Sequence, residues 1–218
     1  MSLFEGHDLT CMRAGRPVFA GLGFALAEGG ALLLTGPNGS GKSSLLRLMA
    51  GLLRPLVGTL TWAGAAVSDD WEAHRARVRF IGHLEAVKPV LSLRENLAFC
   101  AGLHGRPDAE AMERGLAAFA LEDLAEVPGR ILSAGQRRRL ALARLAVSPG
   151  TLWLLDEPTV GLDAASQARL SALMAAHRAG GGAIVAATHT ALELPGAASL
   201  DLTRHAEAAR AAALELAW

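Results

Sequence analysis

Short apolar runs recur along the chain and alternate with segments of helical periodicity. Each run is bounded by Gly, Pro or polar residues, as buried strands usually are. The clearest runs are Ala31–Thr35, Thr59–Trp62, Val78–Ile81, Leu152–Leu155 and Ala183–Ala187. Because alternating strands and helices favour parallel pairing, the pattern predicts an α/β domain with a mostly parallel sheet.

Helical periodicity is clear directly after the first apolar run. From Leu45 to Leu52, apolar residues recur at i, i+3, i+4 and i+7, which predicts a helix that ends at the Arg54-Pro55 break. The last stretch, Arg204–Trp218, is rich in Ala and predicts a further amphipathic helix.

The middle of the chain differs from both ends. Strand patterns are absent after about residue 86, and Leu93–Leu103 and Ala109–Phe119 have helical patterns. We therefore predict one domain over residues 1–218, with a helical subdomain at about 86–142 inserted into the α/β core.

Composition narrows the classes of function. The 218 residues suffice for one domain with a substantial core. Twenty-one basic and twenty-one acidic residues cancel, so the chain lacks the basic excess of nucleic-acid-binding domains and we expect no nucleic-acid partner. No apolar run reaches the roughly 18 residues of a membrane span, and the first residues do not resemble a signal peptide. Cys11 and Cys100 form no CxxC pair, so we expect a cytosolic protein that serves a membrane only through a partner.

The octapeptide GPNGSGKS, at residues 36–43, matches a phosphate-binding loop between a predicted strand and a predicted helix. Its glycines let backbone N–H groups and the helix N-terminus point at nucleotide phosphates. Lys42 would add a positive charge, and the Ser43 hydroxyl can ligate Mg²⁺. A Gly-rich turn with a solvated Lys is the alternative, less favoured because strand, loop and helix are in register. The predicted phosphate-binding residues are Gly36, Asn38, Gly39, Ser40, Gly41, Lys42, Ser43 and Ser44.

The segment TLWLLDEP, at residues 151–158, predicts a buried strand that ends in two acids. Ligands gather at the carboxyl ends of parallel strands. Asp156 is expected to contact Mg²⁺ directly or through a water, and Glu157 to act as the general base on an attacking water. Paired acids also cap helices, and the phosphate loop upstream favours the catalytic interpretation. His189 follows the last apolar run, where its imidazole can contact the terminal phosphate and the water.

The pentapeptide LSAGQ, at residues 132–136, begins another predicted helix. Ser133 is a good N-cap, so an ordinary capped helix is one interpretation. The other is a second anion-binding site, formed by the Ser133 hydroxyl, the Gly135 backbone and the positive helix end. Because one phosphate loop already surrounds the nucleotide from its own side, this second site would have to come from another molecule. The Arg137–Arg139 run is expected to be a solvated surface that faces a partner.

Together these motifs resemble those of ATP-binding-cassette (ABC) transporter ATPases over essentially the whole chain. GPNGSGKS matches the Walker A motif, LWLLDEP Walker B, LSAGQ the family signature, Val160–Asp163 the D-loop, and His189 the switch histidine. The resemblance implies a P-loop NTPase core with an N-terminal β-subdomain and a helical insertion.

The resemblance also implies a mechanism shared between two copies. Two ATP molecules, with Mg²⁺, would lie between the phosphate loop of one subunit and the signature residues Ser133, Ala134, Gly135 and Gln136 of the other, near the D-loop residue Asp163. Closing and reopening of this homodimer would drive integral membrane subunits. The chain would then be peripheral on the cytoplasmic side of the inner membrane.

A narrower resemblance rests on three features: the LSAGQRRRLALARL segment with Ala134 where the family signature usually has Gly, the segment Phe80-Ile81-Gly82-His83, and the small single-cassette size. These resemble the ATP-binding subunits of heme exporters in cytochrome c maturation. The resemblance implies ATP hydrolysis that energises heme export for c-type cytochrome biogenesis, with the heme handled by the membrane subunits.

Two positions depart from the family pattern. Most cassettes have a Gln that reaches Mg²⁺ where this chain, counted back from Glu95-Asn96, has His83, and a neutral imidazole is a poor Mg²⁺ ligand. The usual aromatic residue that stacks on adenine is also absent, since the chain has no Tyr and Arg13 stands near that position. A guanidinium plane can stack on the base, but the sequence favours an ordinary exposed Arg at this position.

Three other functions are compatible with parts of the pattern. One is an ABC transporter ATPase for a different cargo. A second is a soluble cassette ATPase that acts on DNA or ribosomes, but the coiled-coil insertion, zinc motif or second cassette usual in those relatives is absent from the sequence. A third is a P-loop kinase, which would leave LSAGQ and His189 without a role.

Overall fold

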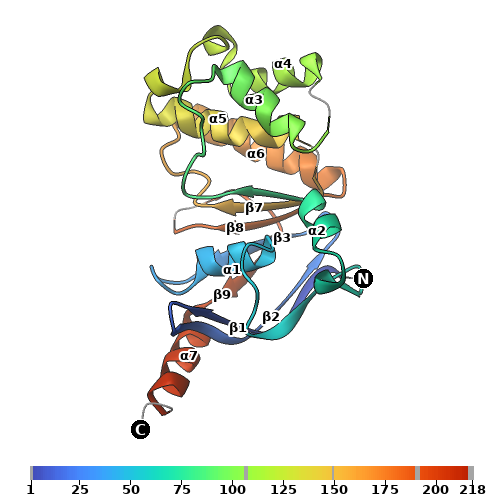
Figure 1. Ribbon diagram of the computed structural model, residues 1–218, viewed down its shortest axis with the longest axis vertical. Coiled ribbons are helices and arrows are strands. Elements are labelled where there is room, and N and C mark those ends of the chain that lie inside the picture. The colour runs from blue at the N-terminus through green and yellow to red at the C-terminus, as the bar shows by residue number, and fades with distance from the viewer. Residues whose placement is uncertain (1, 106–107, 149, 190–191, 216–218) are drawn as a thin grey trace.

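The computed structural model of the chain describes residues 2–105, 108–148, 150–189 and 192–215. Two sheets and a group of helices are stacked along the long axis of the molecule (Figure 1). The strands are β1 (Ser2–Arg13), β2 (Arg16–Ala27), β3 (Ala31–Thr35), β4 (Val57–Trp62), β5 (Ala65–Ala66), β6 (Val78–Ile81), β7 (Leu152–Asp156), β8 (Ala183–Ala187) and β9 (Ala198–Asp201). The α-helices are α1 (Lys42–Met49), α2 (Trp71–Arg77), α3 (Leu93–Gly102), α4 (Ala109–Ala118), α5 (Ala134–Val147), α6 (Ala164–Ala179) and α7 (Thr203–Glu215). The predicted α/β fold is confirmed.

The central sheet contains parallel strands in the order β6-β7-β8-β3-β9. Alternate residues of β7 enter two separate hydrophobic cores, Leu152 and Leu154 on one face, Trp153 and Leu155 on the other. Strands buried on both faces have continuous apolar sequences, so four of the five predicted runs are strands of this sheet. The pattern does not predict β9, because this edge strand is largely exposed.

The fifth predicted run, Thr59–Trp62, lies in β4 of a second, antiparallel sheet with the order β2-β1-β4-β5. Its strands β1 and β2 meet at a tight two-residue turn, Ala14-Gly15, where φ is 49° and 73°. Positive φ at both turn positions matches the twist of a hairpin. This sheet is the N-terminal β-subdomain that the family resemblance implies.

A register shift in β1 sets up a strict requirement for glycine in β4. The pairing of β1 with β4 shifts between His7 and Thr10, and Gly58 faces this shift with φ of +91°. A Cβ at Gly58 would overlap the carbonyl oxygens of His7 and Asp8, which are backbone atoms and cannot rotate away.

Gly58→Ala is therefore expected to lower the free energy of unfolding by about 3 kcal/mol, since backbone strain and a steric clash add. Gly64→Ala is the matched control: its φ is +83°, but nothing lies within 4 Å of the added methyl group. We expect a loss of about 1 kcal/mol there, from the backbone conformation alone. Denaturant unfolding of both variants measures the difference, and equal losses would contradict the predicted overlap.

Helix α1 lies between the two sheets (Figure 1), and its Leu and Met residues are fully buried. The prediction that this helix reaches Arg54 is wrong, since α1 ends at Met49. Gly51 follows with φ of +70°, the left-handed conformation that commonly terminates helices. Leu52, which the pattern assigned to the apolar face, is 59% exposed.

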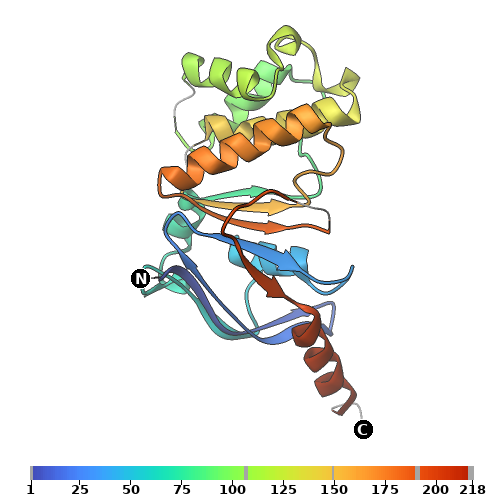
Figure 2. The ribbon, with the colours of Figure 1, turned by 180° about the vertical axis from the view of Figure 1, so that it is seen from behind.

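Helices α3, α4 and α5 pack on one another at one end of the molecule, and α6 crosses between them and the central sheet (Figure 2). Ser92 and Ser133 cap α3 and α5, each within a capping box. Within the proposed range 86–142, the described residues form helices, turns and loops but no strand. Helix α5 crosses the proposed boundary near residue 142 and continues to Val147, with Leu145 and Val147 still buried.

Helix α7 packs against β2 through Ala206 and Ala209, and His205 Nδ1 lies 3.1 Å from the carbonyl oxygen of Ala20. Its C-terminal end points away from the rest of the molecule (Figures 1 and 2). The prediction of a helix over Arg204–Trp218 is confirmed as far as Glu215, and residues 216–218 lie outside the described part. No helix in the described ranges is long and apolar enough to cross a membrane.

Candidate functional site

A cavity of about 500 Å³ opens at the carboxyl ends of the central strands. Its walls come from β2, the β3–α1 loop with the start of α1, the end of β7, and the segments that follow β6, β7 and β8. The lining residues are Val18, Asn38, Gly39, Gly41, Lys42, Ser43, Ser44, His83, Asp156, Glu157 and His189. This position is where open parallel sheets bind ligands, and the volume suits a small molecule such as a nucleotide.

The loop from Gly36 to Gly41 follows β3 and leads into α1. Three of its glycines have positive φ: Gly36 at 126°, Gly39 at 81° and Gly41 at 103°. A Cβ at Gly41 would lie within 3 Å of side-chain atoms of both Val18 and Phe19, so the loop can pass β2 this closely only without a side chain. The first residues of α1, Lys42, Ser43 and Ser44, line the cavity. The first turn contains no acidic residue, so nothing in it offsets the positive potential of the helix N-terminus.

Lys42 and Ser40 show how the loop is held. The Lys42 ammonium donates hydrogen bonds to the carbonyl oxygens of Gly36 and Pro37 at 2.7 and 3.1 Å. These bonds use two of its three donors. Ser40 is buried, and its Oγ has no hydrogen-bond partner among the described residues. Gly36 and Ser40 therefore shape the loop without lining the cavity, in contrast to the other predicted phosphate-binding residues.

The three predicted catalytic and metal-binding side chains at the ends of β7 and β8 lie together. Asp156 ends β7 and is 4% exposed, whereas the Glu157 side chain is 17% exposed. His189 Nδ1 lies 2.8 Å from Glu157 Oε1, and the His189 backbone N–H donates to Oε2 at 3.3 Å. The carboxylate thus holds the exposed imidazole with Nδ1 facing it.

The backbone at Glu157 is in an uncommon conformation, with φ of +48°. Ala187 and Arg138 hold the main chain at this residue. The Glu157 N–H donates to Ala187 O at 2.8 Å, and Arg138 Nη2 donates to Glu157 O at 2.6 Å. Left-handed residues other than glycine cluster at functional sites, where the surroundings impose them. Both contacts come from elements distant in sequence, so tertiary structure fixes the direction of the Glu157 side chain.

The prediction that Arg137–Arg139 forms a solvated surface is wrong for Arg138, which is only 5% exposed. Arg138 shares one face of α5 with Leu142 and Leu145, at i, i+4 and i+7, and this spacing could have identified it. Its two neighbours are half-buried and donate to main-chain carbonyl groups of the helical subdomain.

The two positions that depart from the family pattern differ in their relation to the cavity. His83, two residues after the end of β6, is exposed and lines the cavity. Arg13, at the end of β1, is exposed and does not line it. Val18 of β2 lines it instead and offers an apolar contact beside the loop. No sequence pattern points to Val18, because a single Val in an alternating strand is ordinary.

The signature residues Ser133, Ala134, Gly135 and Gln136 do not line this cavity. Ser133 Oγ accepts from the Gln136 N–H, and Gln136 Oε1 accepts from the Ser133 N–H, so the predicted N-cap is present. A Cβ at Gly135 would lie 3.5 Å from Gly161 O in the D-loop segment. Asp163 caps α6, and its hydrogen bonds with Ser166 lower the pKa of its carboxyl group.

The donor set of the cavity fits Mg²⁺ in part. The Ser43 hydroxyl and the Asp156 carboxylate line the same cavity and supply the oxygen ligands that Mg²⁺ prefers. No group of three or more His, Cys, Asp or Glu residues suited to a metal occurs within the described ranges. A site of this kind suits an ion that takes its remaining ligands from phosphate oxygens and water.

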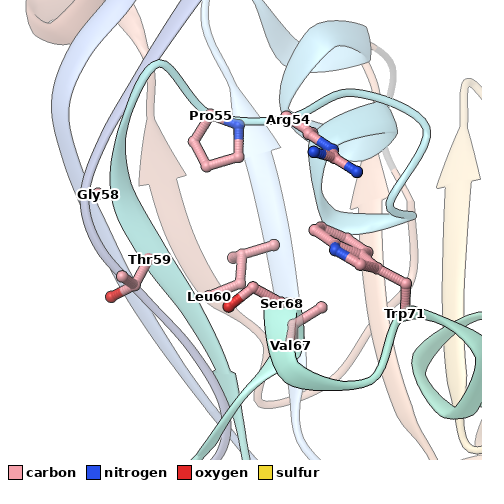
Figure 3. A pocket seen from close by; sticks show the side chains of 8 residues that line it. All are labelled: Arg54, Pro55, Gly58, Thr59, Leu60, Val67, Ser68 and Trp71. Atoms are coloured by element: carbon pink, nitrogen blue, oxygen red, sulfur yellow. The ribbon is translucent and has the colours of Figure 1, made fainter.

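A second, smaller hollow of about 170 Å³ lies beside β4 and α2 (Figure 3). Its lining residues are Arg54, Pro55, Gly58, Thr59, Leu60, Val67, Ser68 and Trp71. The Arg54 guanidinium lies 5.9 Å from the Trp71 ring centre, a cation–π contact. This smaller hollow contains none of the predicted site residues. The predicted catalytic and metal-binding residues line the larger cavity instead.

The fold and the cavity define an ATPase of the cassette type. A family model described as ABC transporter matches residues 19–160, and the chain belongs to that family. A solved structure described as the ATP binding subunit of an ABC transporter covers 86% of this chain and 80% of its own, with 28% identity and a TM-score of 0.78. The dimeric ATP-binding cassette MJ0796, bound to ADP and Pi, has the same fold, with a TM-score of 0.76 at 24% identity, over 86% of this chain and 88% of its own.

Sequence comparison also identifies the branch of the family. The cytochrome c biogenesis ATP-binding export protein CcmA of Rhodospirillum rubrum is 58% identical over 99% of this chain and 92% of its own length. CcmA of Paramagnetospirillum magneticum is 55% identical over 95% of this chain and 97% of its own length. The chain belongs with these CcmA proteins, which confirms the narrower resemblance.

Proposed function

We propose that this ATPase energises the export of heme for the biogenesis of c-type cytochromes, through integral membrane subunits. The observation that carries the proposal is the 58% identity, over almost the whole chain, to a cytochrome c biogenesis export protein. By the same argument the chain is peripheral on the cytoplasmic side of the inner membrane. The similarity to several CcmA proteins favours this cargo over that of another ABC transporter.

The cavity supports specific roles in nucleotide binding. Lys42 and the N–H groups of the loop and the α1 N-terminus would bind the phosphates of ATP. Ser43 and Asp156 would hold Mg²⁺, which would neutralise charge on the phosphate oxygens. Val18 offers an apolar surface to the nucleoside, a role for which Arg13 is a weaker candidate because it lies outside the lining of the cavity.

The carboxylate of Glu157 would accept a proton from the water that attacks the terminal phosphorus. The His189 contact supports this role, because Nδ1 at 2.8 Å from Oε1 restricts the rotation of the carboxylate. A carboxylate already oriented needs less reorganisation in the transition state. His83, which lines the same cavity, would stand where other cassettes have a Gln and would face the bound nucleotide.

The signature residues would complete the site of a second copy. Ser133 and Ala134 are exposed, and α5 offers a capped, positively polarised N-terminus beside them. Such an end binds phosphate. Because these residues do not line the cavity of their own chain, a head-to-tail homodimer is the arrangement that would use them.

The proposal is tested in cells that depend on this chain for c-type cytochromes. Lys42→Ala is expected to abolish heme-containing c-type cytochromes and to reduce ATP hydrolysis by about 100-fold or more, since it removes the cation that faces the phosphates. Arg75→Ala, which removes an exposed cation outside the cavity, is the matched control. Heme staining of membrane fractions and purification of the tagged chain with its membrane partners provide the measurements. Normal cytochrome c levels in Lys42→Ala cells would contradict the proposed role.

A further inference from the structure

The side chain of Arg138 joins three parts of the candidate site. From α5, Nη1 donates to Gly82 O at 3.1 Å, and Nη2 donates to Asp156 O at 3.0 Å and Glu157 O at 2.6 Å. Gly82 follows β6, and Asp156 ends the neighbouring parallel strand β7. One guanidinium therefore ties together the carboxyl ends of two adjacent strands.

Burying the charge of Arg138 in this way costs free energy, which a purely structural role does not explain. Within the described ranges no carboxylate forms a salt bridge with Arg138, and its Nε is buried without a hydrogen-bond partner. Burial lowers the pKa of the guanidinium, opposed by the more distant carboxylates of Glu85 and Asp156. A buried cation whose hydrogen bonds go only to carbonyl groups is less favourable than a neutral side chain in the same space. The presence of a cation at this position is explained if it has a role at the site.

The geometry indicates that role. The Glu157 peptide has φ of +48°, and Arg138 binds the carbonyl oxygen on the C-terminal side of that strained residue. Through Nη1, the same guanidinium also binds the carbonyl oxygen of Gly82. Gly82 is the residue directly before His83, which lines the cavity. Loss of Arg138 would free both segments at once, and the Glu157 carboxylate would lose its fixed direction.

We propose that Arg138 is a positioning residue for ATP hydrolysis, which holds the Glu157 carboxylate and the His83 segment in their working arrangement. This inference rests on the proposed role of Glu157 as the general base. Arg138 itself does not line the cavity, so it acts through the main chain of the residues that do.

The chain offers a closely matched control in Arg79. Arg79 is 7% exposed, and burial lowers the pKa of its guanidinium as well. It donates to Ser148 Oγ at 2.8 Å and to the carbonyl oxygens of Ala76 and Val78, all outside the cavity lining. Arg79→Gln and Arg138→Gln therefore remove similar buried donors, and differ in which main-chain groups they release.

The test compares the purified full-length variants. We expect Arg138→Gln to lower kcat about 10- to 100-fold while the Kd for ATP changes less than threefold, because the phosphate-binding groups stay in place. Arg79→Gln should lower the melting temperature by a similar amount and leave kcat unchanged. Arg138→Lys retains a cation, and its kcat should lie between those of the parent chain and Arg138→Gln. It also replaces Arg138→Gln in the test if that variant does not fold. Equal kcat values for Arg138→Gln and Arg79→Gln would overturn the inference. If Arg138→Gln does not fold, a kcat of Arg138→Lys equal to that of the parent chain would overturn it instead.

A double variant separates this inference from the proposed function. If Arg138 acts through Glu157, adding Arg138→Gln or its Lys substitute to Glu157→Gln should slow single-turnover hydrolysis by less than twofold. A further loss equal to that in the parent chain would mean that Arg138 acts independently, which overturns the inference. Normal hydrolysis by Glu157→Gln alone would instead refute the assigned base. The two failures are therefore distinguishable.

Discussion

Replacing Glu157 by Gln is expected to slow ATP hydrolysis by about 100- to 10,000-fold while ATP still binds, because an amide cannot accept the proton of the attacking water. The groups assigned to phosphate binding, Lys42 and the Gly-rich loop, are unchanged in this variant. ATP should therefore bind and draw two copies together, and the absence of hydrolysis should leave them associated. Phosphate release and nucleotide-binding assays give the two rates, and light scattering gives the mass of the complex with ATP.

Glu28→Gln serves as the control for this experiment, since Glu28 is exposed and lies outside the cavity. It should hydrolyse ATP at the parent rate and form no persistent dimer. If Glu157→Gln hydrolysed ATP normally and stayed monomeric, another group would have to activate the water. His189 would then be the first candidate, since it lies within 2.8 Å of the same carboxylate and also lines the cavity.

Complementation between two inactive variants should give the second large effect. Ser133→Arg places a long cation at the exposed signature position and should abolish hydrolysis, while the monomer still binds ATP through its own loop. Lys42→Ala removes the loop cation and should also be inactive. In a mixed dimer, the intact loop of one variant meets the intact signature of the other, so one composite site is restored. At an equal ratio about a quarter of the parent activity should return, because half of the dimers are mixed and each has one working site.

A control for the Ser133 variant must show that loss of a helix cap is not the cause. Asp108→Arg provides it, because Asp108 is the exposed N-cap of α4 and its side chain accepts from the Glu110 N–H. This variant should lose about 1 kcal/mol of stability and retain hydrolysis. If mixtures of Ser133→Arg and Lys42→Ala remained inactive at every ratio, the head-to-tail arrangement would be refuted.

Much of the fold could be predicted from the sequence because the central sheet is buried on both faces. Strands such as Leu152–Asp156 and Ala183–Ala187 bury all their side chains, and this leaves continuous apolar runs in the sequence. The exposed strand Ala198–Asp201 leaves no such signal. The end of α1 was missed for a different reason: apolar periodicity continues to Leu52, but the left-handed Gly51 terminates the helix before it.

The candidate site was predictable where a short segment contains its own geometry. The glycines of the phosphate loop allow the positive φ angles that wrap it, and Ser133 with Gln136 forms a capping box within four residues. Arg138 was missed, because a basic run looks like a solvated surface until the buried face of α5 is known. Val18 was missed as well, since its place in the cavity depends on how β2 passes the loop.

By itself, the sequence determined the α/β class of this protein, its phosphate loop, the acids that end β7 and the family to which it belongs. These features depend on residues that are neighbours in the chain, so local periodicity and motif spacing contain them. Only the tertiary structure decided that His189 contacts Glu157, that Arg138 links the ends of β6 and β7, and that Val18 rather than Arg13 lines the cavity. Each of these contacts joins segments distant in sequence, and their distances follow from how the two sheets and α5 pack together.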